Sequence, residues 1–170
     1  FIMREILLNV FQVIALLYGI YVISAKSKKK MLRTNFINSA INLSVYIAFG
    51  ELSSLSAQAL ITLRNFAYVF RSKYKTNIVC YLFLCIQVIT AIMTFNSIWG
   101  LLPHLAASIA IVTCWFCDTK RVRTILIASD LAWITYNIHE GLYIESLTFI
   151  IYLLSRICFL IKYRNITETS

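Results

Sequence analysis

The chain has 170 residues, of which 60% are hydrophobic and only 14% are charged, and its formal net charge is +9. A soluble domain of this length carries roughly 25% charged residues, so the composition excludes an ordinary soluble globular protein. The basic residues lie within a few positions of long apolar runs. Anionic lipid headgroups are therefore the expected counter-charge, and nucleic-acid binding is not expected.

Seven apolar segments approach the roughly 20 residues that a helix needs to cross the bilayer core. Gly50 and Gly141 mark tight turns, and Gly100-Leu-Leu-Pro103 is a helix start signal. The first segment has no upstream basic region and no cleavage site, which predicts a helix and not a signal peptide. The predicted helices are 6–24, 34–50, 52–70, 77–95, 101–117, 123–138 and 142–161.

Thirteen of the sixteen Lys and Arg residues fall in four gaps between these segments, at every second turn. Cytoplasmic loops of membrane proteins retain Lys and Arg, so this alternation predicts which gaps are cytoplasmic. The N-terminus is then outside and the C-terminus inside. The four basic gaps are 26–33, 71–75, 120–123 and 162–164.

A shift of 92 residues aligns polar landmarks of the two halves. Asn38 falls on Asp130, and Arg64 falls on Arg156. Because the shift contains four predicted helices, an even number, both halves point the same way. The sequence predicts an all-α, polytopic membrane protein of seven transmembrane helices, built as two parallel three-helix repeats joined by a linker helix. Its single domain, residues 1–170, divides into repeat 1 (about 6–70), the linker helix (about 77–95) and repeat 2 (about 101–162).

Three charged residues within the predicted helices lie at one depth, namely Arg64, Asp130 and Arg156. At about 1.5 Å per residue, this depth is roughly 10 Å inside the predicted cytoplasmic boundary. Lipid cannot solvate them, so Asp130 is expected to pair with Arg156 in the first instance, or with Arg64. If Arg156 takes Asp130, Arg64 faces the neutral Asn38 and becomes a natural seat for an anion. The alternative is that both arginines snorkel to the cytoplasmic interface or pair statically.

Other polar and aromatic residues allow two interpretations. Trp133, Tyr136 and Asn137 could form one wall of a pocket for a small solute, or the aromatic rings could anchor the helix at the membrane interface. His104 and His139 are expected at the surface. Cys114-x-x-Cys117 lacks a second such pair, which favours two small buried apolar residues. No metal, cofactor or catalytic motif is present, so neither a metal, a cofactor nor enzyme activity is expected.

Several motifs occur in a fixed order along the chain. They are Leu101-Leu102-Pro103 opening a helix, Trp115 with Cys117 before a short basic loop, and Trp133-x3-Asn137-x3-Gly141. Over about residues 19–164 the chain thereby resembles the small bacterial inner-membrane family typified by YgjV. The resemblance implies a multi-pass protein of the bacterial inner membrane and no settled activity. Ile61 and Tyr152 stand where that family usually has asparagine.

The 3+1+3 helix arrangement also resembles the SWEET sugar transporters and the nicotinamide riboside transporters, although the prolines that kink helices in many of them are absent. The sequence therefore favours a small-solute transporter or facilitator. The alternative is a non-transporting assembly partner or a membrane-perturbing effector, and a cavity of several hundred Å³ would favour transport. The expected partners are the lipid bilayer and a small polar or anionic solute, with homo-oligomerisation left open. The predicted pathway residues are Asn38, Arg64, Asp130, Trp133, Asn137 and Arg156.

Overall fold

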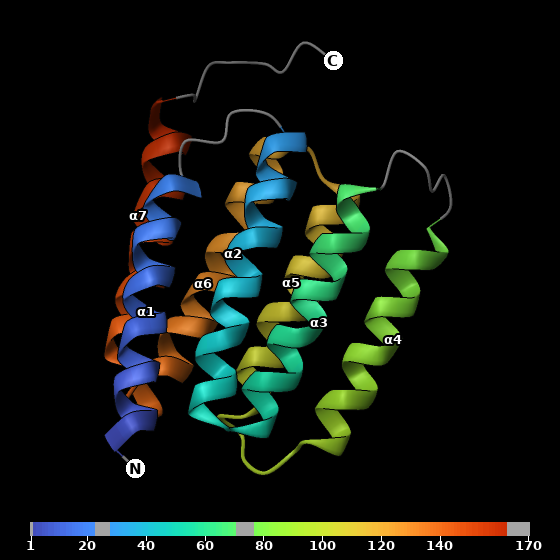
Figure 1. The fold of residues 1–170 in the computed structure, drawn as a ribbon. Helices are drawn as coiled ribbons and strands as arrows, with labels where there is room; N and C mark the ends of the chain where they lie inside the picture. Colours follow the sequence, from blue (N-terminus) through green and yellow to red (C-terminus); the bar gives the residue numbers. More distant parts are fainter. Residues whose placement is uncertain (1, 23–27, 71–76, 163–170) are drawn as a thin grey trace.

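The computed structural model describes residues 2–22, 28–70 and 77–162, and over these residues the chain is helical without strands (Figure 1). The seven predicted helices and the all-α fold class are confirmed. The helices are α1 (Ile2–Val22), α2 (Lys28–Phe49), α3 (Leu52–Val69), α4 (Ile78–Met93), α5 (Leu101–Phe116), α6 (Thr119–His139) and α7 (Tyr143–Lys162).

Most helix boundaries lie within a few residues of the prediction. Three helices begin four to six residues earlier than predicted, namely α1 at Ile2, α2 at Lys28 and α6 at Thr119, and the last two take in basic residues. Lys and Arg are good helix formers, so the basic flank joins the helix although it is too polar for the apolar span. Gly50 and Gly141 have φ values of 82° and 76°, as the predicted turns require. A side chain at either position would be strained in this left-handed conformation.

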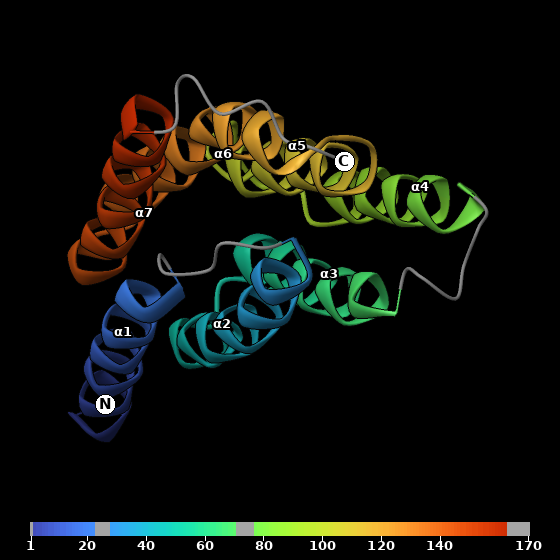
Figure 2. The same cartoon turned by 90° about the horizontal axis from the view of Figure 1, so that it is seen from above.

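The helices form two rows that face each other (Figure 2). One row contains α1, α2 and α3, the other contains α7, α6 and α5, and α4 packs outside against α3 and α5. Contacts of α1 with α7 and of α3 with α5 join the rows at their two edges. If α1 is matched with α5 and α3 with α7, the contact of α1 with α7 corresponds to the contact of α5 with α3. The helices α1, α3, α5 and α7 also run in the same direction (Figure 1). Parallel repeats require this arrangement, while their residue correspondence stays a prediction.

The two ends of the bundle differ in charge. The basic end, where α2 and α6 begin, carries the described residues Lys30, Arg33 and Lys120, whereas Glu51 and Glu140 lie at the opposite, acidic end. The predicted basic gap 71–75 lies outside the described residues, and the gaps 26–33 and 162–164 are described only in part.

The surface of the bundle is apolar, and its interior combines apolar clusters with many buried polar side chains, which differs from the pattern of a soluble protein. Ile92, Met93 and Ile98 are 73%, 78% and 76% exposed. Soluble monomers rarely expose contiguous apolar patches of more than a few hundred Å², so lipid is the expected surrounding. By length and composition alone, one described helix, α7, could cross a membrane, and the apolar α4 and α5 have 16 residues each.

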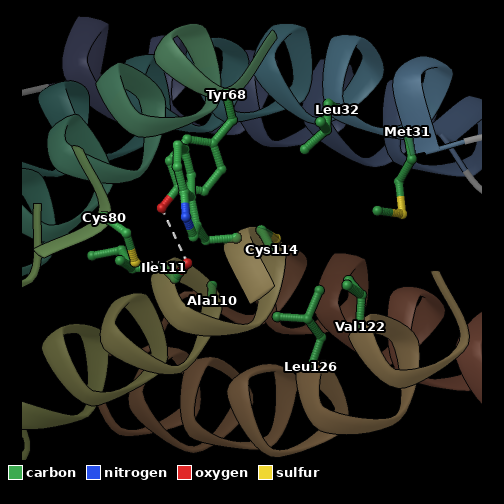
Figure 3. Close-up of a cluster of buried hydrophobic side chains, with 10 residues drawn as sticks. Met31, Leu32, Tyr68, Cys80, Ala110, Ile111, Cys114, Val122 and Leu126 are labelled. Carbon is green, nitrogen blue, oxygen red and sulfur yellow. Dashed lines mark hydrogen bonds between the residues drawn. The ribbon is translucent and has the colours of Figure 1, made fainter. Parts of the chain in front are cut away.

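Two apolar clusters lie one above the other inside the bundle. The basic-end cluster includes Met31, Leu126 and Tyr68, whose hydroxyl donates to the carbonyl oxygen of Ile111 at 3.1 Å and ties α3 to α5 (Figure 3). The acidic-end cluster is aromatic. Its members are Tyr46, Ala57, Ala106, Trp133, Tyr136, Leu142, Phe149 and Tyr152.

Candidate functional site

A cavity of about 130 Å³ lies between the two apolar clusters. Met31 and Leu126 of the basic-end cluster and Trp133 and Phe149 of the acidic-end cluster line it, together with polar side chains of α2, α3, α6 and α7. Both halves of the bundle therefore contribute to one polar interior. Five of the six predicted pathway residues line it, namely Asn38, Arg64, Asp130, Trp133 and Arg156.

Asp130 and Arg156 form a two-pronged ion pair between α6 and α7. Arg156 donates from Nε to Asp130 Oδ2 at 2.5 Å and from Nη2 to Oδ1 at 3.2 Å. Asp130 is 2% exposed, so this pairing provides the countercharge that neither lipid nor water supplies there. The predicted Asp130–Arg156 pair is confirmed.

Arg64, on α3, is 3% exposed and has no carboxylate partner among the described residues. Its Nε and Nη2 both donate to Asn65 Oδ1, at 3.1 and 2.6 Å, and the guanidinium lies 5.7 Å from the centre of the Tyr68 ring. Nη1 is buried without a hydrogen-bond partner in the described part of the chain. The guanidinium points into the protein, so the snorkelling alternative does not apply to Arg64.

Asn38 lines the same cavity as Arg64, as predicted, but the two side chains are not bonded to each other. The Asn38 Oδ1 instead accepts a hydrogen bond of 2.8 Å from the hydroxyl of Tyr152 on α7. Tyr152 reaches this position because Gly19 of α1 leaves room for its ring: a Cβ at Gly19 would lie 2.5 Å from the Tyr152 hydroxyl. The tyrosine at this position thus connects the two halves across the cavity.

The sequence interpretation missed Gln58 and Asn65, which also line the cavity. Asn65 Nδ2 donates to the carbonyl oxygen of Asn35 at 3.2 Å and to Ser39 Oγ at 3.1 Å. Gln58 Nε2 donates to the carbonyl oxygen of Ser39 at 3.0 Å. The spacing of seven residues, which places both amides on one face of α3, was the signal that could have identified them.

Trp133 is a wall of the cavity and not an interfacial anchor. It is 2% exposed and stacks on Phe149, with ring centres 5.5 Å apart and planes inclined by 11°. Asn137 lies beyond it and does not itself line the cavity. The Asn137 Oδ1 accepts a hydrogen bond of 3.0 Å from the hydroxyl of Tyr46, which joins α2 to α6 at the acidic end.

Glu51 fastens the acidic end by accepting three hydrogen bonds. The donors are the backbone N–H of Ser54 at 2.7 Å, the Tyr136 hydroxyl at 2.9 Å and Asn96 Nδ2 at 3.1 Å. Burial acts to raise the pKa of Glu51, but the hydrogen bonds from the backbone and from Tyr136 outweigh it and lower that pKa below its usual range. The charged carboxylate therefore caps α3 and holds α6 beside it.

Two further polar residues are more buried than expected. His104 was expected at the surface, but it is buried between α4 and α5, where its ring nitrogens lie 2.6 Å from Gln87 and 3.0 Å from Thr94. Glu145, at the start of α7, is fully buried, and neither carboxylate oxygen has a partner among the described residues. His139 is exposed, as predicted.

The structure does not assemble metal ligands in the described part of the chain, where no group of three His, Cys, Asp or Glu side chains is close enough to hold an ion. Cys114 is buried and lines the cavity, Cys117 is partly buried, and neither forms a disulfide bond within the described residues. These positions fit the interpretation of the CxxC pair as small apolar residues.

Comparisons with known proteins place the chain in one family. No curated protein and no solved structure matches it. The Imp-YgjV family, described as a bacterial inner membrane protein, matches residues 6–166, which is almost the entire chain. The apolar exterior agrees with that description. The chain belongs to the Imp-YgjV family of bacterial inner membrane proteins.

Proposed function

We propose that the protein is a transporter or facilitator of a small polar solute in the bacterial inner membrane, and that it has no enzyme activity. The observation that carries this proposal is the buried polar cavity between the two halves, in which Arg64 Nη1 and Asn42 Oδ1 have no partner among the described residues. Buried polar groups are normally hydrogen-bonded, so unsatisfied ones that face a cavity are suited to a polar ligand.

The arrangement supports alternating access. The basic-end cluster and the acidic-end cluster lie at opposite ends of the cavity. The two halves meet through the contacts of α1 with α7 and of α3 with α5. Rocking of one half against the other would loosen one cluster while the other stays packed, as in transporters built from repeats. A volume of about 130 Å³ is smaller than the several hundred Å³ expected for transport, so the proposal restricts the solute to small molecules.

The proposal includes seven membrane-spanning helices, with the basic end in the cytoplasm and the acidic end outside, as the retention of Lys and Arg in cytoplasmic loops favours. In a variant without the five native cysteines, Cys introduced at the exposed Tyr143 should react with a membrane-impermeant maleimide added outside intact spheroplasts. Cys introduced at Lys120 should react only after permeabilisation. Labelling of position 120 from outside would reverse the orientation.

Solute uptake by proteoliposomes tests the function directly. Vitamins, nucleosides, sugars and carboxylates form the panel, and liposomes without protein set the background. At least one class should enter faster than background, and Asn38→Ala should slow its entry because Asn38 lines the cavity. Thr135→Ala is the matched control, since Thr135 is exposed on α6 and its hydroxyl bonds only to its own helix, at Leu131 O.

Absence of uptake for every class, with a protein that melts cooperatively, would contradict transport. That outcome would favour the assembly partner or membrane-perturbing effector.

A further inference from the structure

We infer that the cavity binds a small hydroxylated monocarboxylate, with its carboxylate at Arg64 and its hydroxyl at Asn42. The inference rests on the proposed function only in placing the solute in this cavity. It names the chemical class of the solute, which the proposed function leaves open.

Charge in the cavity favours an anion. Arg64 and Arg156 line it together with Asp130, which pairs with Arg156, so Arg64 contributes a positive charge with no carboxylate partner among the described residues. Asp130 uses both of its oxygens to pair with Arg156. In a site of low dielectric constant, a ligand carrying negative charge is therefore favoured over a neutral or cationic ligand.

Arg64 is held in position to bind that anion. Asn65 Oδ1 receives two of its donors, and Asn65 itself is fixed by its hydrogen bonds to Asn35 O and Ser39 Oγ. The partner of Nε and Nη2 is a neutral amide oxygen, so the guanidinium keeps its full charge. The N–H groups of Nη1 have no acceptor among the described residues. A carboxylate oxygen would form a charge-assisted hydrogen bond with them, which is stronger than a hydrogen bond to a neutral acceptor.

Asn42 adds a second requirement. Its Oδ1 is buried and has no donor among the described residues, so an O–H or N–H group of a ligand would satisfy it. Hydrogen bonds place Asn35 of α2 beside Asn65 of α3, and Ser39 of α2 beside Gln58 of α3. Asn42 therefore lies about six residues, or ~9 Å along the helix axis, from the level of the Arg64 Cα. The ligand and the long Arg64 side chain together have to span this gap.

Size and charge select among the ligands that satisfy both positions. A cavity of about 130 Å³ is close in size to the ~150 Å³ cavity that binds benzene, so it suits a ligand of about six non-hydrogen atoms, such as an organic acid of three carbons. An amino acid would also offer N–H donors, but its ammonium group would enter a site with excess positive charge. A hydroxyl group supplies the donor without adding charge.

Lactate and propionate test the inference, because they differ mainly in one hydroxyl group. Binding is measured by isothermal titration calorimetry on the purified full-length protein in detergent, with alanine and inorganic phosphate as further ligands. Lactate should bind at least tenfold more tightly than propionate, because propionate leaves Asn42 Oδ1 unsatisfied. Alanine and phosphate should bind more weakly than lactate.

Variants assign the two contacts. Arg64→Gln should abolish binding of both acids. Arg64→Lys keeps the positive charge and should retain weak binding, and it replaces the Gln variant if that variant does not fold. Asn42→Ala should bind propionate as the wild type does and lose the preference for lactate. Thr135→Ala, on the exposed face of α6, should change neither affinity. Equal binding of lactate and propionate, or a preference that survives Asn42→Ala, would overturn the inference.

The outcomes separate this inference from transport. Binding of lactate without its uptake by proteoliposomes would contradict the proposed function and leave the ligand class standing. Uptake of a sugar or nucleoside together with no binding of lactate would support transport and refute the ligand class. Stronger binding of phosphate than of lactate would identify a general anion site and also refute it.

Discussion

Asp130→Asn is expected to lower the free energy of unfolding by about 3–5 kcal/mol, which is the usual cost of removing one partner of a buried ion pair. The variant leaves the Arg156 guanidinium inside the bundle without its countercharge. Asp130 and Arg156 are 26 residues apart in the sequence but in direct contact in the fold. The double variant Asp130→Asn with Arg156→Gln should recover much of that loss, because no uncompensated charge remains. Thermal unfolding in detergent measures the difference between the two variants.

Asp118→Asn is the matched control for this experiment. Asp118 pairs with Arg121 at 3.5 Å, but the side chains are 44% and 77% exposed, so the pair should contribute at most about 1 kcal/mol. The asparagine can still cap α6 by accepting from the backbone N–H of Arg121, as Asp118 does at 2.8 Å. If the single and double variants at Asp130 were equally destabilised, the loss would come from packing and not from an unpaired charge.

The sequence predicted those parts of the fold that depend on a short stretch of residues or on one interaction partner. Helix number follows from runs of apolar residues, and the turns at Gly50 and Gly141 follow from a conformation that other residues avoid. The Asp130–Arg156 pair was also predictable. Lipid does not solvate a carboxylate at that depth, and few cationic side chains lie at the same depth to pair with it.

The parts that could not be predicted depend on which helices approach each other. Arg64 donates to its neighbour Asn65, while Asn38 accepts a hydrogen bond from Tyr152 of α7. His104 resembles a surface residue at the start of a helix, and it is buried only because Gln87 and Thr94 near the end of α4 lie against it. Such contacts between distant segments leave no pattern in either segment alone.

Trp133 illustrates the same limit and leads to the second large effect. An aromatic residue toward the end of a transmembrane segment fits both an interfacial belt and a pocket wall, so the sequence left both interpretations open. The structure distinguishes them, because Trp133 packs between Tyr46 and Phe149, with ring centres 5.3 and 5.5 Å away, and it lines the cavity.

Trp133→Ala is therefore expected to lower the free energy of unfolding by about 3 kcal/mol, at the lower end of the range for removing a buried tryptophan. The lower end is appropriate because lipid solvates apolar side chains better than water does, while the lost packing contacts still count in full. The variant should also enlarge the cavity and let it accept acids larger than lactate. Thermal unfolding and calorimetric titration with longer hydroxy acids measure the two effects.

The other two tryptophans separate these effects. Trp115 is equally buried, in the basic-end cluster, and donates to Asn77 Oδ1 at 2.9 Å, but it does not line the cavity. Trp115→Ala should destabilise the protein about as much as Trp133→Ala and leave ligand size selection unchanged. Trp99 is 42% exposed at the acidic end, so Trp99→Ala should cost less than about 1 kcal/mol. If Trp115→Ala broadened selection as much as Trp133→Ala, general loosening of the bundle and not a wall at Trp133 would set the size of the solute.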